Sequence, residues 1–180
     1  LMDTLVSELS MLSKLSLDKV PFYFEKIKAK DFFEEYTAYA ADTLGEAGIE
    51  FIYNFECDED REINIDPAQF RRVLNNLIDN SRKYGAEDGT AKIMLSVRNG
   101  ENGHTEISIE DNGQGVPADE RDKIFETFYR GDKARTGHKN GSGLGLAITK
   151  QITDRHGASI RADESELGGL KVIIDLPQAK

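Results

Sequence analysis

Apolar and polar residues repeat along the chain with two periods, and each period predicts one kind of element. Apolar positions three and four residues apart are typical of a helix that buries one face. The pattern predicts helices over 1–17, 31–44, 67–85 and 144–157, and a short helical segment over 119–127. Asp31, with Glu34 three residues later, predicts the beginning of the second helix, because such a pair can satisfy unpaired backbone amides.

Alternation of apolar and polar positions predicts the strands. The alternating or extended segments are 22–28, 49–56, 62–66, 92–100, 105–113, 158–165 and 169–177. After the first helix, the elements follow the order β-α-β-β-α-β-β-loop-α-β-β. This order predicts an α+β fold, a two-layer sandwich with helices packed on one face of a mixed, mostly antiparallel sheet.

The composition agrees with a single folded domain. Of the 180 residues, 38% are hydrophobic and 31% are charged, a balance typical of globular chains. The net charge of −10 argues against nucleic acid as a partner, since that binding depends on neutralising phosphates with Lys and Arg. No apolar run approaches the ~20 residues that span a bilayer. The acidic stretch 57–62 is interpreted as a solvated loop.

Cysteine and histidine are too sparse for a disulfide framework or a zinc-type site. Cys57 is the single cysteine, and His104, His138 and His156 are scattered along the chain. A lone cysteine favours a reducing compartment. Any bound metal is expected to be a hard, oxygen-binding cation such as Mg²⁺.

Two glycine-rich loops carry candidate chemistry, GSGLGL over 141–146 and DNGQG over 111–115. The first fits neither a dinucleotide fingerprint, because position 146 is Leu, nor a P-loop, because no Lys follows Gly141. Its glycines still leave backbone N–H groups accessible before a helix, which suits an anion. Each loop taken alone could equally be a simple turn.

The helix over 67–85 carries polar residues that favour a ligand-binding interpretation of the two loops. Asn76 and Asn80 are four residues apart and share one face beside the apolar stripe, where amides need a partner. That partner could be neighbouring backbone or a ligand. Lys83 and Tyr84 at the helix end add a cation for phosphate and a ring for stacking.

Together these stretches resemble a known family. NLIDNSRKY, DNGQG, IFETFYRGD, GSGLGLAI and the late Gly-Gly pair are similar, in order, to the motif boxes of the catalytic ATP-binding domain of sensor histidine kinases. That domain belongs to the superfamily that includes DNA gyrase and the heat-shock chaperone of about ninety kilodaltons. The resemblance covers about residues 20–177. Five motifs in order are far more specific than any one of them.

The resemblance implies a site for ATP and Mg²⁺. Asn80 is expected to coordinate the Mg²⁺ that bridges the phosphates, with Asn76 close to the same phosphates. Lys83 is expected to contact phosphate, and Tyr84 to pack by the adenine.

The DNGQG loop is expected to bind the base. By the same resemblance, Asp111 accepts a hydrogen bond from the adenine amino group, and Gly113 and Gly115 let the backbone approach the ring. Phe125 and Phe128 anchor a mobile ATP lid that runs through about Asn140, and Arg130 contacts the terminal phosphate. The residues expected to wrap the phosphates are Gly141, Gly143, Leu144 and Gly145. Within the lid, Lys133, Arg135 and Lys139 are more simply interpreted as a solvated basic loop.

The same inventory favours phosphoryl transfer over hydrolysis. Transfer depends mainly on positioning and charge neutralisation. In the ATP-hydrolysing relatives, a glutamate four residues before the metal-binding asparagine activates water; here that position is Asn76, and an amide cannot take a proton.

The phosphoacceptor histidine is expected on a separate helical hairpin upstream. None of the three histidines fits that role, and His156, at the end of a helix, is expected to cap or pack. Residues 1–19 are interpreted as the end of the dimerisation and histidine-phosphotransfer helix, although an ordinary N-terminal helix is also possible, and 20–180 as the kinase domain. The expected partners are that hairpin, a second copy in the full-length protein and a response regulator, with this domain on the cytoplasmic side of a membrane-anchored sensor.

Two other functions stay open at this point. One is a serine kinase of the anti-sigma-factor type, which the IFETFYRGD patch and the helical segment 1–19 disfavour. The other is a catalytically silent nucleotide-binding module, which the intact set of asparagines, Asp111 and glycines disfavours.

Overall fold

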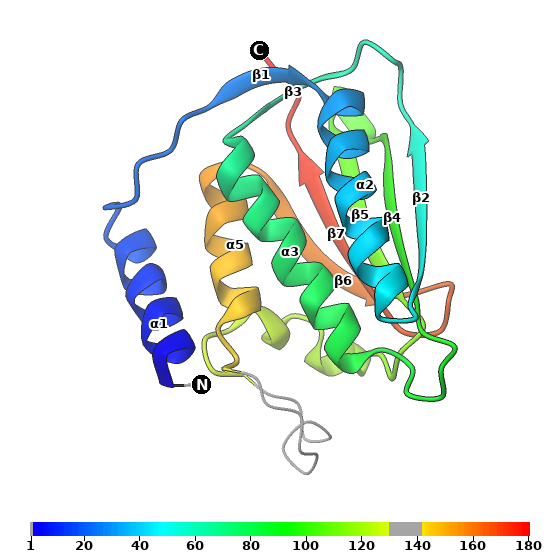
Figure 1. Cartoon of the computed structure of the whole chain (residues 1–180). Helices are drawn as coiled ribbons and strands as arrows, with labels where there is room; N and C mark the ends of the chain where they lie inside the picture. The colour runs from blue at the N-terminus through cyan, green and yellow to red at the C-terminus, as the bar shows by residue number, and fades with distance from the viewer. Residues whose placement is uncertain (1, 130–141) are drawn as a thin grey trace.

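The structure, a computed structural model, describes residues 2–129 and 142–180, which form two layers. Helices α2, α3 and α5 cover one face of the main sheet, and α1 lies beside α5 (Figure 1). The helices are α1 (Met2–Ser16), α2 (Ala29–Glu46), α3 (Pro67–Tyr84) and α5 (Gly145–Arg155). The strands are β1 (Glu25–Lys28), β2 (Glu50–Glu56), β3 (Glu62–Ile65), β4 (Lys92–Asn99), β5 (Thr105–Asp111), β6 (Ser159–Glu164) and β7 (Leu170–Leu176). The predicted α+β two-layer fold is confirmed.

The main sheet has the strand order β2-β4-β5-β7-β6. Only β2 and β4 are parallel, and the other neighbours are antiparallel. Leu95 pairs with Ile109, which pairs with Val172 on its other side, and all three are buried. The alternation read from the sequence therefore places one apolar face of each central strand against the helices.

Two short strands lie outside the main sheet, and the sequence did not predict this separate pairing. β1 and β3 form their own antiparallel pair, with Ile27 opposite Ile63. The exposed acidic turn before β3 contacts the β1–α2 junction through ion pairs of Lys28 with Asp60 and Lys30 with Glu59. The stretch 57–62 is thus largely the solvated loop that was expected, although its last residue begins β3.

Helix ends follow the expected chemistry at α3 but not at α2. Asp66 caps α3 by accepting a hydrogen bond from the Gln69 amide at 2.9 Å, Pro67 occupies the first turn, and Gly85 ends the helix. The prediction that Asp31 begins α2 is wrong: the helix begins at Ala29, and Asp31 lies in its first turn. An acidic residue there still interacts favourably with the helix dipole.

The predicted short helix over 119–127 is instead two 3₁₀ turns, η2 (Ala118–Glu120) and η3 (Lys123–Phe125). A third, η1 (Glu101–Gly103), lies in the hairpin between β4 and β5. The segment after β5 therefore turns repeatedly and packs Ile124 into the core.

The second half of α1 packs on α5. Leu12 and Leu15 are buried, and the Ser16 hydroxyl and the Gln151 amide lie within hydrogen-bonding distance. Just beyond α1, Asp18 forms an ion pair with Arg155. The first half behaves differently, because its apolar residues are exposed at Leu5, Val6 and Leu9.

His156 joins three segments at the end of α5. Its Nε2 accepts a hydrogen bond from the Asp66 amide at 3.0 Å, and its Nδ1 lies 2.8 Å from the Ile152 carbonyl. The Asp66 carboxylate also accepts from the Tyr23 amide at 2.8 Å. Burial lowers the pKa of His156, which favours the neutral ring that these two contacts require.

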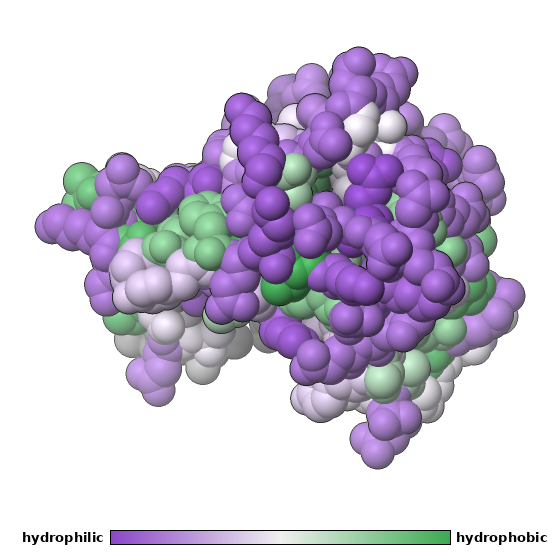
Figure 2. All heavy atoms as spheres, turned by 90° about the horizontal axis from the view of Figure 1, so that it is seen from above, coloured by the Kyte–Doolittle hydropathy of each residue, from purple (hydrophilic) through white to green (hydrophobic). Residues whose placement is uncertain are grey.

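The surface seen from above is mostly hydrophilic, with hydrophobic groups in small, interrupted patches (Figure 2). No helix among the described residues has both the length and the apolar character needed to cross a membrane.

Candidate nucleotide-binding site

The site lies where α3, the beginning of α5 and the end of β5 meet. α3 and α5 pack side by side in the helical layer (Figure 1). The Asn76 side-chain amide donates to the Gly145 carbonyl at 3.2 Å and to the Thr149 hydroxyl at 3.3 Å. Thr149 in turn donates to the same carbonyl at 2.9 Å. Asn76 therefore joins α3 to the first turn of α5, which is the partner that its position beside the apolar stripe required.

Asn80 lies one turn further along the same face of α3. Its side chain is half-buried and makes no hydrogen bond to any residue of the described ranges. A half-buried amide with this spare capacity fits a ligand atom. At the end of the helix, the Lys83 ammonium lies 5.3 Å from the centre of the Tyr84 ring.

Asp111 ends β5 inside the protein and is only 2% exposed. Its Oδ1 accepts hydrogen bonds from the amides of Gly113 at 2.9 Å and Leu170 at 3.2 Å, and the Ser81 hydroxyl also bonds to the carboxylate. Burial raises the pKa of Asp111, and these three donors oppose that effect. A carboxylate offers about four acceptor positions, so about one is left for a ligand.

Two glycines let backbone segments approach one another around Asp111. A Cβ atom at Gly113 would lie 2.1 Å from the Tyr84 carbonyl oxygen, and one at Gly169 would lie 2.5 Å from the Asp111 carbonyl oxygen. Side chains cannot be accommodated at such distances. The end of α3, the loop after β5 and the β6–β7 turn are thus held in contact around one carboxylate.

A buried ion pair supports the β6–β7 turn from behind. The Lys171 ammonium lies 3.0 Å from Glu110 Oε1, and the Ser165 hydroxyl donates to Glu110 Oε2 at 3.0 Å. Ser165 also accepts from the Leu167 amide at 3.0 Å, so the turn that carries Gly169 is bonded to the residue next to Asp111. Sequence reasoning missed Ser81, Ser165 and Lys171, because no local pattern pairs residues so far apart.

The IFETFYRGD stretch contacts the GSGLGL loop. The Phe128 amide donates to the Gly143 carbonyl at 3.0 Å. Both residues have left-handed backbones, with φ of 63° and 71°, and a Cβ at Gly143 would lie 3.0 Å from Phe128 Cα. Phe125 packs against the core, whereas Phe128 is 56% exposed. Phe128 and Gly143, which lie on either side of the residues outside the described ranges, are therefore adjacent.

Several predicted residues lie outside the described ranges. They are Arg130, Lys133, Arg135, His138, Lys139, Asn140 and Gly141. In the GSGLGL loop, which was predicted to wrap the phosphates, Leu144 is fully buried and Gly145 begins α5. Gly115 has a left-handed φ of 65° and approaches Gly169.

The geometry fits a nucleotide with its phosphates at the beginning of α5. The amides in the first turn of an α-helix lack intrahelical partners, and α5 has no side-chain N-cap bond. Such a terminus favours an anion. Asp111 offers an acceptor for a hydrogen-bond donor such as the amino group of a base.

Comparison with known proteins agrees with this geometry. Residues 65–180 match the family described as histidine kinase-, DNA gyrase B- and HSP90-like ATPase. The chain is 41% identical over 132 residues, 73% of its length, to the sensor histidine kinase WalK of Bacillus subtilis, and it covers 21% of that protein. It is 42% identical over 112 residues, 62% of its length, to the sensor protein kinase WalK of Staphylococcus aureus, and it covers 27% of that relative.

Solved structures share the fold. The catalytic domain of the histidine kinase ThkA superposes with a TM-score of 0.72 at 23% identity, covering 88% of this chain and 100% of that one. Full-length ShkA in complex with AMPPNP superposes with a TM-score of 0.81 at 23% identity, covering 98% of this chain and 36% of that one.

Proposed function

The chain belongs to the histidine kinase-, DNA gyrase B- and HSP90-like ATPase family, and from that premise we propose how its residues serve as the ATP-binding catalytic domain of a sensor histidine kinase. The observation that carries the proposal is the carboxylate of Asp111, buried at the end of β5 with about one acceptor position to spare. The homologues of the chain are sensor histidine kinases, of which it spans about a fifth to a quarter.

ATP and Mg²⁺ would be held by three groups of residues. Asp111 would accept the adenine amino group, with Gly113 and Gly115 against the ring and Tyr84 packed beside it. The amides of Gly143, Leu144 and Gly145 would bind phosphate at the beginning of α5, close to Lys83. Asn80 would supply an amide oxygen to Mg²⁺, a ligand that this cation accepts. Arg130 and Gly141 belong to the same proposal, as do Phe125 and Phe128 as anchors of the lid.

When bound, ATP with Mg²⁺ would supply an activated phosphoryl group with its charge partly neutralised. The residues of the protein would position the reacting groups. Asn76 holds α3 to the first turn of α5 through Gly145 and Thr149, which would fix the amides proposed to bind phosphate relative to Asn80. Because an amide cannot accept a proton, Asn76 does not activate water, and the site favours transfer to a nucleophile brought by another domain.

The acceptor would be a histidine on a separate helical hairpin. Within the described residues, His156 is buried with both ring nitrogens in contact with protein, and His104 contacts Asp175 in a hairpin turn. We infer that residues 1–19 end the dimerisation helix and that 20–180 form the kinase domain. The full-length protein would act as a membrane-anchored homodimer that passes the phosphoryl group to a response regulator.

Two measurements test this proposal. Calorimetry should detect ATP binding that requires Mg²⁺ for full affinity, and Asn80→Ala should remove the Mg²⁺ dependence. The chain, mixed with its histidine-bearing hairpin, should then transfer labelled phosphate to it. An acid-stable product would favour a serine kinase, and nucleotide binding without any transfer would favour a silent module; either result would contradict the proposal.

A further inference from the structure

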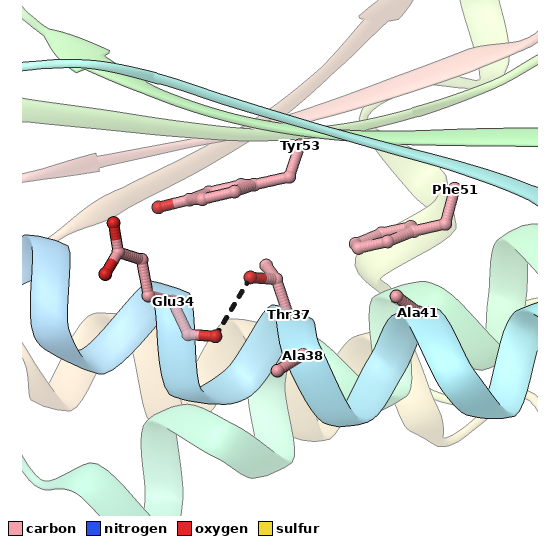
Figure 3. Close-up of a pocket in the computed structure, with 6 residues that line it drawn as sticks. All are labelled: Glu34, Thr37, Ala38, Ala41, Phe51 and Tyr53. Atoms are coloured by element: carbon pink, nitrogen blue, oxygen red, sulfur yellow. Dashed lines mark hydrogen bonds between the residues drawn. The ribbon is translucent and has the colours of Figure 1, made fainter.

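A groove opens between α2 and β2, on the edge of the sheet away from the nucleotide site. β2 is an edge strand, because among the described residues it pairs only with β4. The groove has a volume of about 370 Å³ (Figure 3). Its lining residues are Glu34, Thr37, Ala38 and Ala41 from α2 and Phe51 and Tyr53 from β2. We call it the α2–β2 groove.

One end of the α2–β2 groove carries polar groups without partners. The Tyr53 hydroxyl is buried and has no hydrogen-bond partner among the described residues, and burial, with the nearby Glu34 carboxylate, raises the pKa of Tyr53 to about 12. Figure 3 shows that carboxylate beside the hydroxyl. Glu34 is exposed and forms no ion pair within the described ranges. This end of the groove thus carries an exposed negative charge next to a buried, neutral hydroxyl that lacks a partner among the described residues.

The rest of the groove is apolar. The Thr37 hydroxyl is occupied by the carbonyls of Phe33 at 2.7 Å and Glu34 at 3.2 Å. Ala38 and Ala41 leave space opposite the Phe51 ring (Figure 3). An apolar wall that ends in a carboxylate and a hydroxyl is complementary to an apolar stem with a cationic head, which is the shape of an arginine or lysine side chain.

The free edge of β2 indicates how such a side chain would arrive. An unpaired edge can bind an extended segment through backbone hydrogen bonds, and every second side chain of that segment then faces the helical layer. Phe51 and Tyr53 are themselves two residues apart, so an added strand would place side chains at the same spacing over the apolar part and over Glu34. Exposed Glu56 and Asp58 follow at the strand end, and the chain carries a net charge of −10, so the edge favours a basic partner.

We propose that the α2–β2 groove binds an extended, basic segment of a partner protein as an added strand on β2. An arginine or lysine of that segment lies between Glu34 and Tyr53, and an apolar residue two positions away lies over Ala38 and Phe51. This surface is separate from the nucleotide site, and the inference does not depend on the proposed kinase activity.

An NMR titration of the ¹⁵N-labelled chain tests the proposal. The probe is a short peptide of alternating Thr and Val that carries one Leu and one Arg two positions apart, and its control has Glu in place of Arg. We expect the Arg peptide to shift the amide signals of β2. Glu34→Lys should raise its dissociation constant by about tenfold or more, and Tyr53→Phe should raise it by about threefold.

Glu46→Lys is the matched variant, because it makes the same charge change about 18 Å along α2. It should alter the affinity less than twofold. Equal binding of the Glu peptide, equal effects of the two lysine variants, or an absence of shifts in β2 would each overturn the proposal. Shifts in β2 that depend on the concentration of the chain alone would instead indicate a second copy as the occupant, and would also overturn it.

Discussion

A Cβ atom on Gly169 would lie 2.2 Å from Oδ1 of Asp111, so the β6–β7 turn and the end of β5 can touch only while residue 169 is glycine. The same hypothetical atom would meet the Asp111 carbonyl oxygen and the Gly113 amide nitrogen at 2.5 Å. These are backbone atoms at the end of a central strand, so they cannot move aside as a flexible side chain could.

Gly169→Ala is therefore expected to lower the free energy of unfolding by about 1–3 kcal/mol or more, the usual cost of overpacking. Gly45→Ala is the matched control, because a Cβ there meets nothing within 4 Å on α2, and it should be neutral or stabilising by up to ~1 kcal/mol. Urea denaturation measures both. Equal effects of the two substitutions would contradict the close approach at Gly169.

Lys171→Met should strongly destabilise the chain, because it leaves the Glu110 carboxylate buried without its cation. The side chains of this pair are 13% and 4% exposed, and breaking a buried pair costs roughly 3–5 kcal/mol. The double variant Glu110→Gln/Lys171→Met should recover most of that loss in a double-mutant cycle. The exposed ion pair of Lys28 with Asp60 gives the comparison: Lys28→Met should have little effect on stability, and an equally small effect of Lys171→Met would refute the buried pair.

His156 predicts a loss of stability in mild acid. Burial lowers the pKa of His156 in the folded state. As the pH falls below the ordinary histidine pKa of 6.5, the unfolded chain therefore binds more protons than the folded chain. The contribution of His156 to the free energy of unfolding should therefore be fully present above about pH 6.5. It should decrease as the pH falls toward the lowered pKa of His156, by ~1.4 kcal/mol for each unit by which that pKa is lowered. Urea unfolding at pH 7 and pH 5 measures this, and His156→Gln should flatten the dependence. An unchanged slope in the variant would show that another group is responsible.

Asp111→Asn is expected to change how the stability of the chain depends on pH. Because burial raises the pKa of Asp111, the folded state gives up its proton less readily than the unfolded chain. The carboxyl group's contribution to stability is therefore present below its ordinary pKa of 3.8 and is lost as the pH rises through the folded pKa. The variant lacks this loss, so its stability relative to the natural chain should increase between pH 4 and pH 7 in urea denaturation. A relative stability that decreases over that range would contradict the burial of this charge.

Apart from the start of α2 and the segment over 119–127, local pattern was enough to predict the helices α1, α2, α3 and α5, the strands of the main sheet and the two-layer fold, because periodicity records which face of each element is buried. It also predicted that Asn76 needs a partner. It could not predict that the partner is Gly145 and Thr149, since the contact joins residues about seventy positions apart. The same limit explains why the separate pairing of β1 with β3 was missed.

The error at Asp31 has a different cause. The Asp31–Glu34 pair has the spacing of a capping box, yet the chain already turns at Lys28, where β1 ends its pairing with β3 and the Ala29 amide bonds to the Arg61 carbonyl. Strand pairing thus decided where α2 begins. The assignments of Asn80, Lys83, Tyr84 and Asp111 to nucleotide remain predictions, supported by the geometry around β5 and α5.

The most direct test of the account is a calorimetric titration of the chain with a non-hydrolysable ATP analogue in the presence of Mg²⁺, repeated with Asp111→Asn. Replacing a charged acceptor costs about 1.5–3 kcal/mol, so the account predicts saturable binding to the natural chain and a dissociation constant roughly 10–100-fold higher for the variant. Unchanged affinity in a folded Asp111→Asn chain, or no binding to the natural chain, would contradict the assignment of this site to ATP.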